Sequence, residues 1–173
     1  MDEMVKALNK HGEETGVIIE KLEAHKEGVC HGISAVAIIN DEGKVLLQKR
    51  APTKRDEPGK WDLSAAGHIS ADDTAEEAAI RETIEEIGIK ITKADLQQID
   101  TYLFEKYEEN KKISHYTYLF IVRKDIDKDK IVMQKSEVGE VKFVDKNDYN
   151  RMLKNGEMVG AIKYCGKILE YMK

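Results

Sequence analysis

Three glutamates at helical spacing are the residues that point most directly to chemistry. Glu82, Glu85 and Glu86 stand three and four positions apart, so on a helix their side chains lie within one turn of one another. Like charges at these spacings repel, and each raises the pKa of the others unless a cation intervenes. Mg²⁺ prefers oxygen ligands, so the cluster suits this ion together with substrate phosphate oxygens. The competing interpretation is a solvated helix face on which Glu77 pairs with Arg81.

The element that must position these glutamates is a helix predicted over residues 74–87. Thr74 followed three residues later by Glu77 forms a capping-box pattern, and Gly88 suits the C-terminal end of the helix. Apolar residues recur at helical spacing, which predicts that one side of the helix packs on a sheet. These residues are Ala75, Ala79, Ile80, Ile84 and Ile87.

The wider frame around the glutamates is more specific than the cluster itself. Gly67 is followed after five residues by Asp73 and, after seven more, by the run RETIEEIGI over residues 81–89. This frame resembles the Nudix box, here residues 67–89. Two positions depart from the family pattern, which has glutamate in place of Asp73 and usually a bulky aliphatic residue in place of Thr83. At the start of a helix a carboxylate favours the positive dipole end, so we expect a non-catalytic role for Asp73.

The resemblance to the Nudix box implies a role for each residue of the cluster. Glu85 and Glu86 are implied as the main metal ligands, with Glu82 as the third and the carbonyl of Gly67 completing the shell. Arg81 is implied to orient a glutamate through a charge-assisted hydrogen bond. The cofactor that we expect is Mg²⁺, with Mn²⁺ as a substitute.

Basic residues just before the box indicate how the negative charge of a substrate would be neutralised. Each of them alone also fits a solvated surface; they are Arg50, Lys54, Arg55 and Lys60. The reaction that we predict is attack of metal-activated water on a phosphorus of a nucleoside diphosphate derivative or a similar X-linked diphosphate. The general base is either a box glutamate or one of two glutamates in the predicted loop KSEVGE, Glu137 and Glu140.

A second resemblance raises an alternative activity. Residues 31–89 look like the Nudix subgroup related to type I isopentenyl diphosphate isomerases, which need an acid and a base to move a double bond. Those isomerases have a cysteine where this chain has Ala66, and acidic residues where this chain has Ile113 and His115, so we favour hydrolysis. His31 and His68 match metal-binding positions of the isomerases, but we interpret them as packed, hydrogen-bonded histidines and do not count them as ligands.

A third alternative is a Nudix-type module that binds a nucleotide without catalysing a reaction. Such modules usually show a degraded box. The presence of Arg81 together with the three glutamates argues against this alternative.

Length and charge limit the kinds of protein and partner. The chain has 173 residues and a net charge of -5, so we expect one domain over residues 1–173, with residues 1–30 as an N-terminal extension. A negative surface argues against nucleic acid polymers and anionic membranes. The expected partner is therefore a small-molecule diphosphate, and a homodimer is one assembly that the sequence leaves open.

Cysteine usage and the N-terminus indicate a cytoplasmic location. Cys30 and Cys165 match no metal-ligand spacing and fit reduced thiols. No apolar run approaches the roughly 18 to 20 residues that span a bilayer. Asp2 and Glu3 stand where a secretory signal would carry positive charge.

The pattern along the chain predicts a mixed sheet covered by helices on both faces. A small hairpin is expected from residues 4–8 and 15–19, and a central hairpin from residues 32–39 and 44–50 around a turn at 40–43. Further strands are expected at 98–107, 115–123 and 140–144, and helices at 146–154 and 160–172. The predicted class is α/β, or α+β by a stricter label, and the Nudix resemblance implies an α/β/α sandwich with a mixed β-sheet.

Overall fold

The computed structural model describes residues 3–108, 111–160 and 162–173. In chain order the strands are β1 (Met4–Leu8), β2 (Glu14–Glu20), β3 (His31–Ile39), β4 (Val45–Arg50), β5 (Trp61–Asp62), β6 (Ala65–His68), β7 (Gln97–Glu108), β8 (Lys111–Arg123) and β9 (Val138–Val144). The helices are α1 (Lys21–Glu27), α2 (Ala75–Ile87), α3 (Lys146–Lys154) and α4 (Ile162–Lys167), with short 3₁₀ turns at Lys93–Asp95, Lys128–Lys130 and Ile168–Glu170. Among the described residues no helix is long and apolar enough to cross a membrane.

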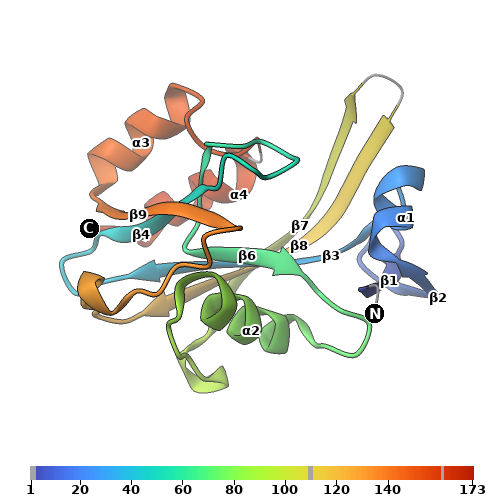
Figure 1. Ribbon diagram of the computed structural model, residues 1–173, viewed down its shortest axis with the longest axis horizontal. Coiled ribbons are helices and arrows are strands. Elements are labelled where there is room, and N and C mark those ends of the chain that lie inside the picture. The colour runs from blue at the N-terminus through green and yellow to red at the C-terminus, as the bar shows by residue number, and fades with distance from the viewer. Residues whose placement is uncertain (1–2, 109–110, 161) are drawn as a thin grey trace.

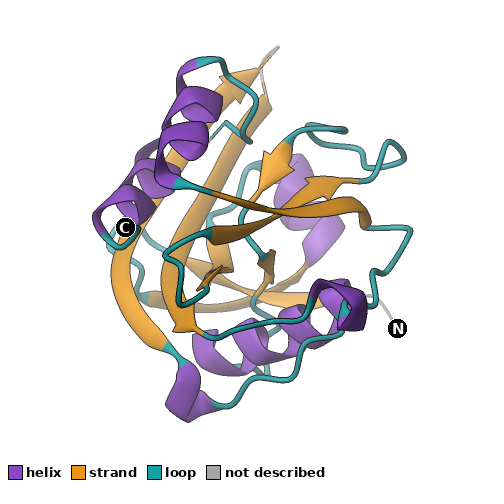
Figure 2. Cartoon of the chain, turned by 90° about the vertical axis from the view of Figure 1, so that its left-hand side faces the viewer, coloured by secondary structure: helices purple, strands orange, loops and turns teal. Residues whose placement is uncertain are grey.

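Helices cover both faces of a curled mixed sheet, as the sequence predicted (Figures 1 and 2). The buried side chains of β3 alternate between the two layers. Ala35, Ala37 and Ile39 pack in a core that includes residues of α3 and α4. Val36 and Ile38 pack in a second core that includes residues of α2. A strand that is buried on both faces explains why this segment is apolar throughout rather than alternating.

The predicted central hairpin is wrong in part. Strands β3 and β4 exist, but they share only the pair Ile39↔Val45 and then separate. β3 instead runs parallel to β8 along its whole length and antiparallel to β6. β4 turns away to pair with β5 and β9. The turn between β3 and β4 was predicted because its residues are adjacent in the sequence. The strands that pair with β3 and β4 come from distant segments, which the local sequence pattern does not specify.

The N-terminal hairpin is confirmed, with β1 and β2 antiparallel. The structure adds helix α1, which the sequence pattern did not predict because seven residues are too few to show helical periodicity. Gly28 ends α1 in the left-handed conformation, with a φ of 70°. Figure 1 shows α1 beside the sheet, close to β8.

Helix α2 is confirmed, with the predicted capping box between Thr74 and Glu77 and with Gly88 as its C-terminal cap. The predicted apolar stripe is only partly right. Ile87 is fully buried, but the side chain of Ile84 is 41% exposed. Thr83 is buried in its place, because its hydroxyl donates to the Ala79 carbonyl at 2.7 Å and leaves no unsatisfied polar group. The buried side of α2 is therefore rotated toward its glutamates.

Of the two predicted C-terminal helices, the first matches its predicted range and the second is shorter. Helix α3 matches the predicted range of residues 146–154. The helix expected at 160–172 includes residue 161, which lies outside the described residues. Within the described part, α4 covers Ile162–Lys167 and gives way to a 3₁₀ turn at Ile168–Glu170. Gly166 lies at this change and lowers the helix propensity.

Candidate active site

Glu86 is the most deeply buried residue of the glutamate cluster. It is 7% exposed, and its carboxylate oxygen Oε2 accepts hydrogen bonds from Gln48 Nε2 at 2.6 Å and from the Ala66 amide at 3.0 Å. Burial raises the pKa of the Glu86 carboxyl to about 8, against the lowering effect of the Ala66 hydrogen bond. A carboxyl in this setting needs a cation if it is to be negatively charged at neutral pH.

Arg81 joins the cluster to the loop before the helix. Its guanidinium donates to Glu82 Oε1 at 2.6 Å, to Asp73 Oδ2 at 3.0 Å and to the His68 carbonyl at 2.9 Å. The expected charge-assisted hydrogen bond to a glutamate is therefore present. The alternative in which Arg81 pairs with Glu77 does not hold, because Glu77 closes the capping box.

Gly67 lies directly against Glu82. A Cβ atom at this position would stand 2.1 Å from Glu82 Cδ, so only glycine permits this approach of the β6 backbone to the carboxyl group. Burial raises the pKa of Glu82, while the charge of Arg81 lowers it. The side chain of Glu85 is 52% exposed and reaches Arg81 at 3.4 Å. We call these four groups, the Gly67 backbone with Glu82, Glu85 and Glu86, the glutamate site.

Three of the four predicted phosphate-neutralising cations, Arg50, Lys54 and Lys60, have a partner within the protein. Lys54 forms an ion pair with Glu137. Arg50 donates to the Asp56 carbonyl at 3.0 Å and lies 3.7 Å from Asp62, and Lys60 donates to a backbone carbonyl. The structure thus pairs one predicted substrate cation, Lys54, with one predicted general base.

The two glutamates of the KSEVGE segment differ in position. Glu137 does lie in a loop, and this loop docks on the end of α2, where the Gln134 amide donates to the Glu86 carbonyl at 3.0 Å. Glu140 was expected in the same loop, but it lies on β9, with its carboxylate 3.9 Å from Lys49 Nζ. The strand starts two residues earlier than predicted because Val138 is buried against the core.

A second polar cluster lies beyond β6 and was not predicted as a group. His25, His31, His68 and His115 come from α1, β3, β6 and β8, and one ligand atom from each lies within 4.8 Å of the others. His31 and His115 face each other in the parallel register of β3 and β8. We call these four residues the histidine cluster.

Each of the three strand histidines of this cluster is shielded from water. Burial lowers the pKa of His31 and His68, and that of His115 to about 3, so their rings are neutral at pH 7. The interpretation of His31 and His68 as packed, hydrogen-bonded histidines is confirmed, since His31 Nδ1 lies 2.8 Å from the Val29 carbonyl and His68 Nε2 lies 2.9 Å from His25 Nε2. His25 was not predicted as a site residue because its helix was not predicted, and the resemblance to the isomerases indicated only His31 and His68.

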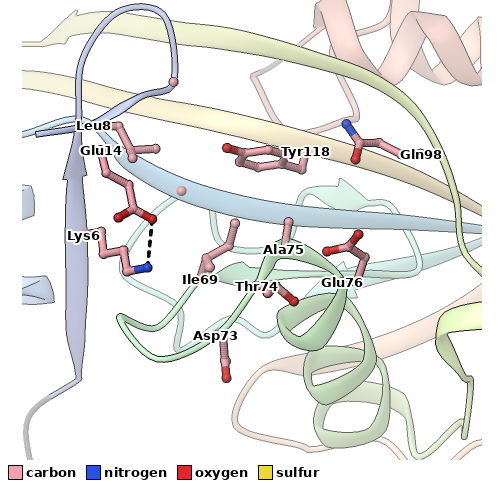
Figure 3. A pocket seen from close by; sticks show the side chains of 12 residues that line it. Lys6, Leu8, Glu14, Ile69, Asp73, Thr74, Ala75, Glu76, Gln98 and Tyr118 are labelled. Carbon is pink, nitrogen blue, oxygen red and sulfur yellow. Dashed lines mark hydrogen bonds and ion pairs between the residues drawn. The ribbon is translucent and has the colours of Figure 1, made fainter.

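A cavity beside α2 is lined by residues that belong to neither the glutamate site nor the histidine cluster (Figure 3). It has a volume of about 290 Å³ and lies between the N-terminal hairpin and the start of α2, where Lys6, Glu14, Asp73, Thr74 and Tyr118 are among its lining residues. Lys6 and Glu14, both on the hairpin side of this cavity, form an ion pair at 2.8 Å (Figure 3).

Comparison with known proteins identifies the family. The NUDIX domain model matches residues 30–163. Nudix hydrolase 3 from Arabidopsis thaliana is 36% identical over 157 residues, a match that covers 88% of this chain but only 20% of the plant protein. An uncharacterised Nudix hydrolase from Listeria monocytogenes is 34% identical over 152 residues, covering 88% of this chain and 85% of that protein. Isopentenyl-diphosphate Delta-isomerase 2 from Photorhabdus laumondii is 30% identical over 163 residues, a match that covers 94% of this chain and 88% of that protein.

A solved structure agrees with this result at the level of the fold. A protein from Deinococcus radiodurans superposes with a TM-score of 0.74 over 99% of this chain and 100% of that chain, at 18% sequence identity. At this low sequence identity, the likeness supports the fold alone. The family model and the relatives of matching length support family membership, because their matches include the residues of the glutamate site. The chain belongs to the Nudix hydrolase family.

Proposed function

We propose that this chain hydrolyses a diphosphate linkage in a nucleoside diphosphate derivative or a similar X-linked diphosphate, with Mg²⁺ as cofactor and Mn²⁺ as a substitute. The observation that carries the proposal is the buried carboxyl of Glu86 beside the mostly buried Glu82 on the box helix. Two carboxyl groups withdrawn from water favour a cation between them, and oxygen donors suit Mg²⁺. The donor set of this chain therefore fits the ion that the family implies.

The residues around the site hold its ligands in place. Glu82, Glu85 and Glu86 would bind the ion together with the Gly67 carbonyl. Bound Mg²⁺ supplies Lewis acidity and lowers the pKa of a coordinated water. Gln48 and the Ala66 amide orient Glu86, and Arg81 orients Glu82.

The ion pair between Lys54 and Glu137 suggests how a proton is accepted. A bound diphosphate would compete with Glu137 for Lys54, because both offer anionic oxygen atoms to the same ammonium group. Release from Lys54 would leave Glu137 as a general base at the edge of the site, on the loop that docks on α2. Arg50 and Lys60 lie near that loop and would neutralise the remaining phosphate charge.

A phosphate-release screen tests the proposal. Nucleoside diphosphates, nucleoside triphosphates, nucleotide sugars, dinucleotide cofactors and prenyl diphosphates would be incubated with the protein and Mg²⁺ or Mn²⁺. We expect turnover of at least one diphosphate by the wild type and by Glu76→Gln, a control on the same helix outside the glutamate site, but not by Glu86→Gln. Nucleotide binding without turnover would favour the non-catalytic module instead.

Isomerisation of isopentenyl diphosphate is the second candidate, because an isomerase is among the relatives at 30% identity. Moving a double bond needs two positioned proton-transfer groups. Ala66 has no ionisable side-chain proton, and its amide already donates a hydrogen bond to Glu86. His115, at the other position, is partly buried in the histidine cluster. We therefore expect no dimethylallyl product and no deuterium incorporation when the protein is incubated with isopentenyl diphosphate in D₂O.

A further inference from the structure

We propose that Glu57 is a positioning residue that holds the loop between β4 and β5, residues 51–60, in place for a bound diphosphate. We call this segment the basic loop, because it carries the cations Lys54 and Lys60. The inference rests on the proposed function, which assigns these cations to the substrate. Glu57 was not among the site residues predicted from the sequence. Its carboxylate accepts hydrogen bonds from the amide of Gly160, 103 positions away, at 2.9 Å to Oε1 and 3.0 Å to Oε2.

The backbone of Glu57 has an unfavourable conformation. Its φ is 46°, and among the residues that the structure describes it is the one non-glycine residue with a positive φ. A glutamate in this left-handed region is strained, because Cβ then crowds the following carbonyl oxygen. Such strain persists only where the surroundings hold the residue in place. The hydrogen bond from Gly160 is charge-assisted and therefore strong enough to oppose the strain. The conformation of the loop thus depends on this contact.

The first half of the basic loop is tied to the loop that carries Glu137. The Ala51 amide donates to the Glu137 carbonyl at 2.8 Å, and Lys54 forms an ion pair with the Glu137 side chain. In the proposed mechanism a diphosphate competes with Glu137 for Lys54. Substrate binding therefore removes the side-chain part of this attachment.

The second half of the basic loop is tied to the segment before α4. Lys60 donates to the Gly156 carbonyl, and Glu57 accepts from Gly160. Lys60 is one of the cations assigned to the substrate, so its side chain cannot hold the loop and bind a phosphate oxygen at once. An anionic substrate attracts the lysine but not the carboxylate of Glu57. The contact of Glu57 therefore remains when the lysines turn to the phosphates.

Gly160 is a suitable anchor for this contact. It follows a segment whose backbone pairs with β5, since the Trp61 amide donates to the Glu157 carbonyl at 2.9 Å and the Val159 amide donates to the Trp61 carbonyl at 2.8 Å. A Cβ atom at position 160 would stand 3.2 Å from Glu57 Oε1, so a larger residue would push the carboxylate outward. The anchor is thus fixed and leaves room for the carboxylate.

The position of Glu57 separates a role in the site from a role in global stability. Its side chain is exposed and belongs to neither hydrophobic core. Loss of its contact should therefore leave the Tm nearly unchanged and act on the loop alone. The apparent affinity of a ligand falls with the fraction of molecules in the binding-competent state. A basic loop that is held less often should bind a diphosphate more weakly.

Two substitutions that differ by one methylene separate reach from charge. Glu57→Gln and Glu57→Asn both remove the negative charge and both offer an amide oxygen, but only glutamine is long enough to reach the Gly160 amide. Asparagine tolerates the left-handed region well, so added strain cannot explain a loss that is confined to Glu57→Asn. Limited trypsin digestion measures opening of the loop at Lys54 and Arg55. We expect cleavage at least about fivefold faster in Glu57→Asn than in Glu57→Gln, at equal Tm.

Binding of methylenediphosphonate with Mg²⁺ tests the link to the diphosphate. The P–C–P linkage is not hydrolysed, so titration calorimetry measures affinity without turnover. We expect a Kd about fivefold higher for Glu57→Asn than for Glu57→Gln, because fewer molecules have the loop held. Gly160→Ala displaces the same carboxylate from the other side. It should weaken binding relative to the wild type and add nothing in combination with Glu57→Asn.

Several outcomes would overturn the proposal. Equal cleavage of Glu57→Asn and Glu57→Gln would show that reach to Gly160 does not matter. Equal affinity for the probe would show that the contact holds the loop without serving the site, and a lower Tm for Glu57→Asn would make the contact one of global stability. Failure of the wild type to bind the probe would also refute it. If the expected differences are found but no diphosphate is hydrolysed, the proposed hydrolysis fails and the role of Glu57 stands.

Discussion

The glutamate site and the histidine cluster lie on neighbouring residues of one strand, and their chemistry is opposite. Gly67 contacts Glu82, while the next residue, His68, turns its ring into the histidine cluster and its carbonyl toward Arg81. One site offers oxygen donors and an exposed ligand, Glu85; the other offers nitrogen donors from one buried and three partly buried histidines. The first donor set suits a hard ion with room for substrate, and the second suits a borderline ion.

Burial affects the two sites in a parallel way. It raises the pKa of the Glu86 carboxyl to about 8 and lowers the pKa of the His115 ring to about 3, so both groups favour their neutral form without a cation. At both sites, burial disfavours the charged or protonated side chain, so a bound cation would stabilise the ligand form. The donor type then decides which cation is preferred.

Removal of one carboxylate from the glutamate site is expected to have the largest effect, which is loss of hydrolysis. Glu86→Gln should lower turnover by at least about 100-fold, because it removes a metal ligand. Steady-state kinetics at limiting Mg²⁺ measure this loss. Near wild-type activity at limiting Mg²⁺ would remove Glu86 from the site.

The pH dependence of stability should differ in sign between the two sites. The folded-state pKa of His115 is lowered, so its stability contribution is present above the unfolded pKa and is lost as the pH falls. Between pH 7 and pH 5, in chelator, the wild type should lose about 2 kcal/mol relative to His115→Gln. Glu86 has a raised pKa, so relative to Glu86→Gln the wild type should gain stability over the same interval. Urea unfolding at both pH values measures these differences, and equal signs would refute the contrast.

The smallest effect is expected at the position where the chain departs from the family pattern. Asp73 contacts Arg81 from outside the glutamate site, and an asparagine can still accept that hydrogen bond through its amide oxygen. Asp73→Asn should therefore keep turnover within a few fold, with Asp72→Asn as the exposed control. Loss of turnover in a folded Asp73→Asn protein would place this residue among the metal ligands.

The sequence by itself determined the elements whose signals are local. Helix α2 with its capping box, the N-terminal hairpin, α3 and the long strands β7 and β8 follow from spacing and turn residues within single segments. The Nudix resemblance implied that Arg81 orients a glutamate, and the structure identifies that glutamate as Glu82.

Only the tertiary structure decided which distant segments meet. The parallel register of β3 and β8 places His31 beside His115, and the packing of α1 brings in His25. The same long-range pairing separates β3 from β4, buries Glu86 and Thr83, and leaves Ile84 exposed. Hydrophobic periodicity within a segment indicates that one face of the segment is buried. It does not indicate which strand or helix packs there, because strand pairing and side-chain burial depend on contacts between distant segments.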